Sequence, residues 1–179
     1  MKRHLFLSIC SLFVCVVCFA QTNYYTESKV FDEEGYAYQC DIKFGDVVLY
    51  NKANKWTGIE QKYKATGEIF KPENIVTTYE SWLEYRKKFP RIMKTALSDI
   101  DEDLQRNIRG QLFLDLFINT ETGRVDDVVF YFFRKSGLVY IPISVFRQLE
   151  LSIKETCRFT ITEEGKRVNY AYLWDSFKF

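Results

Sequence analysis

The sequence predicts an α+β domain in which helices cover one face of an antiparallel sheet. The N-terminal half of the chain is expected to form a β-meander. Residues 36–44 alternate apolar and polar side chains, which is the two-residue period of a half-buried strand. The C-terminal half reads helix, strand, strand, helix, strand, with apolar strands and amphipathic helices. Only three prolines and eight glycines occur in 179 residues, which argues against a disordered chain.

Residues 1–20 have the pattern of a cleaved signal peptide. Two basic residues begin the segment, an apolar run follows over 5–17, and small side chains precede an expected cleavage after Ala20. We therefore expect a periplasmic or secreted protein with no membrane span in the mature chain. Two alternatives remain: an uncleaved membrane anchor, for which the apolar run is short, and a lipid-modified Cys18.

Cleavage would change the formal charge from +1 to about −1 and remove three of the five cysteines. The mature chain then carries no basic surface for nucleic acid. Its length suits one well-buried domain and hardly two. A β-rich part, 21–78, and an α+β part, 79–179, are expected to pack as one globular unit, because no Gly- or Ser-rich linker separates them.

The residue pattern of the β-rich part predicts short antiparallel strands. Residues 36–44 form the first and 47–50 the second, with glycine-containing turns on either side of 36–44. Residues 56–63 and 68–70 flank a further turn and are expected to pair as well. The exposed face of this meander would carry many Tyr and Lys residues.

Two helical patterns follow. Ser81-Trp82-Leu83-Glu84 has the S-x-x-E form of a capping box, which predicts that a short helix starts there. Pro90 either kinks this helix or opens the next one. Apolar side chains then recur at steps of three and four, which predicts one helix of about five turns. These residues are Met93, Leu97, Ile100, Leu104 and Ile108.

Gly110 stands where that helix is expected to stop. Residues 111–119 and 124–133 are apolar on both faces, which is typical of strands that are central in a sheet or covered on both sides. Gly123 lies in the turn between them, at a position expected to need a positive φ. The two strands therefore predict a hairpin.

A helix and a strand pair complete the chain. Pro142 suits the first turn of a helix, and Glu150 and Lys154 are expected to pair on the side of that helix away from its apolar stripe. Residues 158–162 and 167–175 are then expected as strands, joined by a turn that contains Gly165.

The region from about residue 89 to 179 resembles the TonB C-terminal domain. In that family an apolar strand after a glycine leads through a turn with glycine and valine into a second strand, then a helix and a G-K-x-V strand. The matching residues are Gly110, Gly123, Val125, Asp127, Val128, Gly165, Lys166 and Val168. The resemblance implies an envelope protein of a Gram-negative bacterium whose sheet edge accepts an extended peptide. This chain looks unlike an energy transducer, because it lacks the long Pro-rich spacer of TonB.

Chemistry-bearing residues are sparse. The single histidine, His4, lies in the leader, so the mature chain offers no imidazole for catalysis or metal binding. Cys40 and Cys157 would form one disulfide or remain two buried free thiols; the sequence leaves both open. No nucleotide-binding or nucleophile motif occurs. We therefore expect no cofactor, no metal and no enzymatic activity; an enzyme working with carboxylates and tyrosines is the remote alternative.

Two acidic groups are better explained by structure than by chemistry. The cluster at 99–103 lacks the glycine and distal glutamate of a calcium loop and is expected to be a solvated helix face. Asp126 and Asp127 are adjacent on a strand, so their side chains point to opposite faces and cannot act together on one atom.

Two kinds of partner remain. The first is an unidentified envelope protein or peptide, bound at a sheet edge. The second is a glycan or small ligand on a Tyr/Trp-rich face formed by Tyr50, Trp56 and Tyr63; an ordinary sheet face guarded by lysines is its plainer interpretation. We expect an exported interaction or scaffolding module, with glycan or small-ligand binding as the alternative. The oligomeric state is open.

Overall fold

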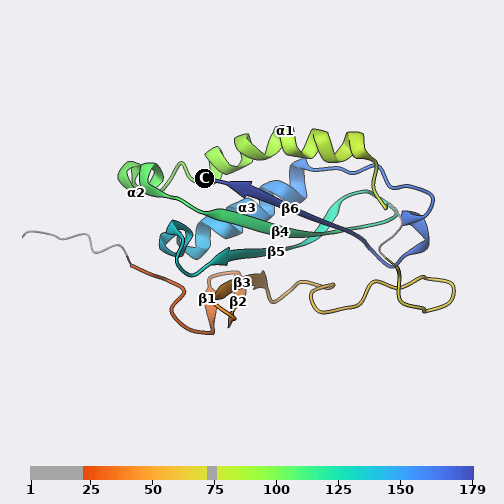
Figure 1. Ribbon diagram of the computed structural model, residues 1–179, viewed down its shortest axis with the longest axis horizontal. Helices are drawn as coiled ribbons and strands as arrows, with labels where there is room; N and C mark the ends of the chain where they lie inside the picture. Colours follow the sequence, from red (N-terminus) through yellow and green to blue (C-terminus); the bar gives the residue numbers. More distant parts are fainter. Residues whose placement is uncertain (1–21, 72–75) are drawn as a thin grey trace, which may run out of the picture.

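The structure is a computed structural model that describes residues 22–71 and 76–179. The predicted signal peptide lies outside these residues. The described chain forms a six-stranded sheet in the order β1-β2-β3-β5-β4-β6, in which all neighbours are antiparallel (Figure 1). This confirms the α+β class. The strands are β1 (Lys29–Glu33), β2 (Tyr36–Lys43), β3 (Asp46–Asn51), β4 (Gln111–Ile118), β5 (Val125–Phe133) and β6 (Ala171–Lys178).

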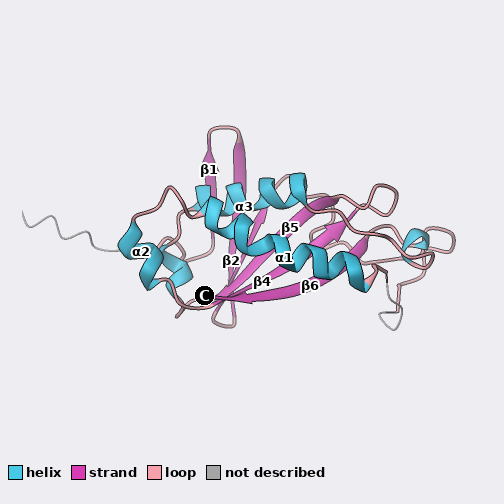
Figure 2. Ribbon diagram, turned by 90° about the horizontal axis from the view of Figure 1, so that it is seen from above, coloured by secondary structure: helices cyan, strands magenta, loops and turns pink. Residues whose placement is uncertain are grey.

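Helices lie on one face of this sheet. α1 (Tyr79–Ala96) and α3 (Ile143–Thr156) run side by side across it, and the short α2 (Glu102–Asn107) lies beyond its end (Figures 1 and 2). Two 3-10 turns, η1 (Gly137–Tyr140) and η2 (Gly165–Arg167), precede α3 and β6.

The main core fills the space between the helices and the sheet. Alternate side chains of β4 and β5 point into it and are almost wholly buried. Phe146 of α3 lies at its centre, stacked on Phe132 with ring centroids 5.3 Å apart and packed edge-on against Phe130 and Tyr25. These ring contacts join α3 to β5 and to the segment before β1.

The helix boundaries differ from the prediction. α1 begins at Tyr79 because the side chain of Thr78 accepts the N–H of Ser81, so Ser81 is the third residue of the helix and not its N-cap. Pro90 lies within α1, which continues to Ala96. The single helix predicted over 93–108 is wrong, because the Asp101 carboxylate accepts two backbone N–H groups and starts α2 there as its N-cap.

Three predicted strands are also absent from the described residues. Segments 56–63, 68–70 and 158–162 make only isolated bridges, such as Lys62 with Ile69 and Arg124 with Arg158. β1, which the sequence did not predict, is a largely exposed edge strand paired with β2.

Two of the expected turn glycines are tightly enclosed. Gly123 has a φ of +66°, and a Cβ there would lie 2.1 Å from the carbonyl oxygen of Phe159. At Gly165 a Cβ would lie 2.2 Å from the carbonyl oxygen of Val76. Both positions therefore require glycine, because a backbone neighbour occupies the space that a side chain would need.

Candidate functional site

The face of the sheet opposite the helices, called the outer face below, is rich in aromatic side chains. Cross-strand pairs place Phe113 beside Tyr131 and Phe117 beside Tyr172, with Asp115 opposite Trp174. Trp174 is 56% exposed, Phe133 49% and Tyr172 38%. The aromatic residues of the outer face are Tyr50, Phe113, Phe117, Tyr131, Phe133, Tyr170, Tyr172 and Trp174.

Asp115 is the carboxylate at the centre of this face. Its oxygens accept the hydroxyls of Tyr131 and Tyr172, each at 2.6 Å. Burial raises the pKa of Asp115, and the two tyrosine hydrogen bonds partly offset that rise. Burial and the neighbouring carboxylate likewise raise the pKa of both tyrosines. The three groups hold one another in place, and both donors are already committed to the carboxylate.

A loop covers one end of the outer face. Trp56 packs on Tyr170 with ring centroids 5.0 Å apart. Its backbone N–H donates to Asp127 at 2.6 Å, and its indole N–H donates to Asp126 at 3.4 Å. The adjacent carboxylates therefore position this loop together. The expectation that they point to opposite faces is wrong, because the register of β4 and β5 shifts between Phe117 and Ile118 and leaves Asp126 unpaired in the ladder. Lys55 lies 4.1 Å above the Trp56 ring and shields it further.

Of the predicted binding residues, the structure brings two together. Tyr50 and Trp56 belong to the small cluster on the outer face. Tyr63 instead packs against Phe70 on the main core and donates its hydroxyl to Glu164. Trp174 is not among the binding residues predicted from the sequence. Its alternation with Tyr172 along 167–175 is the pattern that places both rings on one face of a strand.

The edge of the sheet at β6 is open beside these rings. The N–H of Phe179 bonds to the carbonyl of Gly110, and in an antiparallel pair such inward bonds recur at every second residue. The backbone groups of Tyr172, Trp174 and Ser176 consequently point away from β4. The carbonyl of Ser176 accepts the guanidinium of Arg86 at 3.3 Å, which agrees with this direction. Within the described chain, no strand pairs with this edge.

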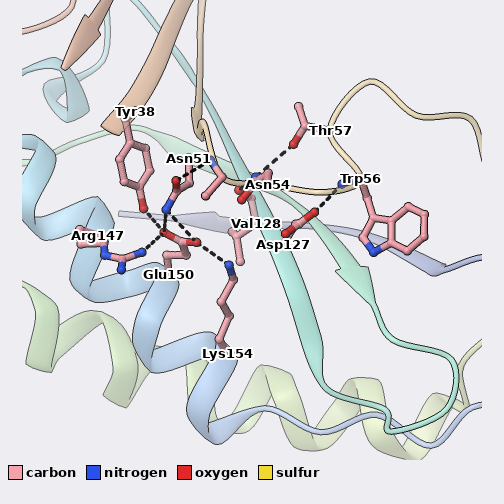
Figure 3. A network of polar contacts seen from close by, with 11 residues as sticks. Tyr38, Asn51, Asn54, Trp56, Thr57, Asp127, Val128, Arg147, Glu150 and Lys154 are labelled. Atoms are coloured by element: carbon pink, nitrogen blue, oxygen red, sulfur yellow. Dashed lines mark hydrogen bonds and ion pairs between the residues drawn. The ribbon is translucent and has the colours of Figure 1, made fainter. Parts of the chain in front are cut away.

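A second polar group lies on the helix side, around Glu150 (Figure 3). Glu150 is fully buried, contrary to the expectation of a pair on the far side of its helix. Its carboxylate binds Lys154 at 2.6 Å and Arg147 at 2.9 Å. It also accepts the Tyr38 hydroxyl and the Asn51 amide of the N-terminal strands. Four donors thus hold one carboxylate between α3, β2 and β3.

Burial alone would raise the pKa of Glu150. The hydrogen bonds from Lys154, Tyr38 and Asn51 and the charge of Lys154 outweigh this and lower it below its ordinary value. Because the carboxylate is enclosed and its donors come from the surrounding elements, the group joins the two halves of the fold. It offers no exposed surface for a ligand.

The two cysteines remain free. Cys40, on β2, and Cys157, at the end of α3, are both buried thiols. Of the two states that the sequence left open, the structure therefore has the free thiols and not the disulfide. Burial raises the pKa of both thiols, which keeps them protonated and unreactive.

The described residues contain neither a group of metal ligands nor a helix suited to a membrane. No group of histidine, cysteine or acidic side chains among them could hold a metal ion. In the acidic cluster, Asp101 caps α2, and Arg106 pairs with Glu102 and Asp103. None of the described helices combines the length and apolar character that crossing a bilayer requires.

Comparison with known proteins gives a family. A model described as Domain of unknown function (DUF5043) matches residues 21–174. The fold is similar to the crystal structure of a DUF5043 family protein from Bacteroides uniformis ATCC 8492, with a TM-score of 0.74 and 30% sequence identity over 88% of this chain and 94% of that chain. A search among curated proteins found no match. The family match covers almost all of the sequence after the predicted leader, and the chain therefore belongs to the DUF5043 family.

Proposed function

We propose that this protein is an exported, non-enzymatic interaction module that binds an extended segment of an envelope protein along β6. The observation that supports this best is the pair Tyr172 and Trp174, which combine outward-facing backbone groups with exposed rings. Strand addition at such an edge gains affinity from main-chain hydrogen bonds and specificity from alternate side chains. The resemblance of residues 89–179 to the TonB C-terminal domain and the apolar leader support the same assignment.

The surroundings of β6 define what such a segment would meet. Side chains on one face of the added strand would contact Trp174 and Tyr172 on the outer face. Those on the other face would approach Arg86 of α1, which already bonds to the Ser176 carbonyl and lies 3.5 Å from the Asp175 carboxylate. Because Arg86 occupies that end, we expect pairing to be centred on Tyr172 and Trp174.

Replacing Tyr172 with proline should abolish binding, because proline removes the outward N–H. Tyr172→Thr is the matched control: it also removes the ring and its bond to Asp115 but keeps the N–H. Binding is measured by photo-crosslinking in the native cells, with a photoreactive phenylalanine derivative in place of exposed Trp174 on β6 or of exposed Glu155 on α3. We expect one partner to be crosslinked from position 174, lost with Tyr172→Pro and retained with Tyr172→Thr.

Three results would contradict strand addition. The first is equal crosslinking from positions 174 and 155, and the second is equal loss with both substitutions at Tyr172. The third is crosslinking that survives Tyr172→Pro unchanged. Circular dichroism of each purified variant checks that the fold is kept, since proline is tolerated on edge strands.

Glycan binding on the outer face is the second candidate, and a specific observation favours it. Trp174 stacks on Phe113 with ring centroids 5.9 Å apart and planes 26° apart, which forms a flat and partly exposed aromatic surface. The hydroxyls of Tyr131 and Tyr172 lie on the same face.

Titration with oligosaccharides, followed by tryptophan fluorescence, tests this candidate. A change in wild type that persists in Trp56→Phe and disappears in Trp174→Phe would support it. Retention of glycan binding in Tyr172→Pro, with loss of the protein crosslink, would show that the two activities are separate. An unchanged spectrum across a broad glycan panel would count against this candidate.

A further inference from the structure

The tip of the β2–β3 hairpin carries an unusual residue. Phe44 has a φ of +52° and Gly45 a φ of +95°, while the flanking Lys43 and Asp46 pair directly. Two successive positive φ values define a type I′ turn, in which Asn-Gly is the favoured sequence. A phenylalanine there is strained, and its ring is fully exposed to solvent. Both features cost stability, and no contact within the described chain offsets them.

A positively charged groove of about 950 Å³ lies beside this ring. Phe133, 49% exposed, is its second aromatic residue. Arg109, Arg134 and Lys135 line it, while Asp46 is the one acidic residue among its described lining side chains.

The cations of the groove are held in place without being neutralised. The guanidinium of Arg109 donates to the carbonyls of Arg106 and Ile108, and that of Arg134 donates to the carbonyl of Thr26. These are uncharged acceptors, so the positive charge of both side chains remains available to an anionic partner.

The start of the described chain lies in the same place. Asn23 lines the groove, and the sequence has an apolar run over 5–17 shortly before it. The positive charges, the exposed rings and the start of the described chain therefore all lie at one end of the molecule.

We propose that this end docks on an anionic membrane surface. The rings of Phe44 and Phe133 enter the boundary between headgroups and acyl chains, and Arg109, Arg134 and Lys135 contact lipid phosphates. A protein partner would need a matching hollow to cover a fully exposed ring on a projecting turn, whereas a bilayer deforms around it. The proposal does not depend on binding at β6, because no groove residue belongs to that strand.

The test uses residues 21–179 with sedimented vesicles of phosphatidylcholine alone or mixed equally with phosphatidylglycerol. We expect binding to the anionic vesicles only. Phe44→Asn should weaken it about ten-fold or more, because one buried ring is lost. The same substitution creates the favoured Asn-Gly turn, so its thermal midpoint should rise. Misfolding cannot then explain the loss. The matched control is Tyr79→Asn. Tyr79 is also an exposed aromatic residue but lies on α1, away from the groove, so this substitution should leave vesicle binding unchanged.

Charge reversal provides the second arm. Lys135→Glu should weaken binding to anionic vesicles about ten-fold, while Arg124→Glu, in the β4–β5 turn at the opposite end of the sheet, should not. Wild-type sedimentation with neither vesicle, or with both equally, would overturn the proposal. So would unaltered binding of Phe44→Asn. Retention on an immobilised acidic peptide without vesicle binding would assign the surface to a protein partner instead.

Discussion

Replacing Glu150 with alanine should lower the free energy of unfolding by about 3–5 kcal/mol, which is the effect expected when one partner of a buried ion pair is removed. The substitution leaves Arg147 and Lys154 close together with no anion between them. It also leaves the Tyr38 hydroxyl and the Asn51 amide without their acceptor. Urea denaturation followed by circular dichroism measures this loss.

The matched control is Glu155→Ala, at an exposed glutamate on the same helix. It should change stability by no more than about 0.5 kcal/mol, because surface substitutions away from special contacts rarely do more. If the two variants unfolded at similar denaturant concentrations, the enclosed carboxylate would not hold the halves of the fold together.

The same carboxylate predicts how stability depends on pH. The pKa of Glu150 is lowered in the folded state, so its contribution is present above the ordinary glutamate pKa of about 4.3 and declines as pH falls through the folded value. Glu150→Gln is neutral at every pH. The stability difference between wild type and Glu150→Gln should therefore shrink as the solution is acidified below about pH 4. A difference that stayed constant down to acidic unfolding would argue against a charged Glu150.

Replacing Gly123 with alanine should destabilise the protein by about 3 kcal/mol or more, through two additive causes. The positive φ of +66° is costly for any residue with a Cβ, and that Cβ would lie 2.1 Å from the Phe159 carbonyl oxygen. Relief requires the segment around Phe159 to move, which breaks the 2.8 Å bond from its N–H to the Gly123 carbonyl.

Gly67→Ala separates the two causes. Gly67 has a similar φ of +73°, but no atom lies within 4 Å of its virtual Cβ. It should cost only the conformational strain of about 1–2 kcal/mol. Equal thermal shifts in the two variants would show that the close approach at Gly123 carries no energetic weight.

The predictable parts of the fold are those in which side-chain pattern and backbone pairing agree. β4, β5 and α3 lie within a few residues of their predicted bounds, because long apolar stretches ending in glycine or beginning after proline leave few alternatives. The helix break before α2 was missed, since a single capping side chain, Asp101, prevails over a continuous apolar stripe. Segment 158–162 reads as a strand locally, but it pairs only at isolated positions.

The candidate site was less predictable for a related reason. Alternation places Tyr172 and Trp174 on one face of a strand, but which face stays open depends on the side on which the helices pack. The same limit applies to Glu150, whose polar neighbours come from β2 and β3, far away in sequence. Phe44 reads as the last apolar residue of a strand; the pairing of Lys43 with Asp46 places it in the turn instead.

The two ends of the described chain lie toward the same end of the sheet. Asn23 and Gly110 line the same groove, and the N–H of Phe179 bonds to the Gly110 carbonyl. A short linker could therefore join the ends of the folded domain, and a circularly permuted chain could begin at the exposed turn around Gly67. An affinity tag fused directly before Asn23 or after Phe179 would crowd the groove, whereas a reporter inserted at that turn would leave it free.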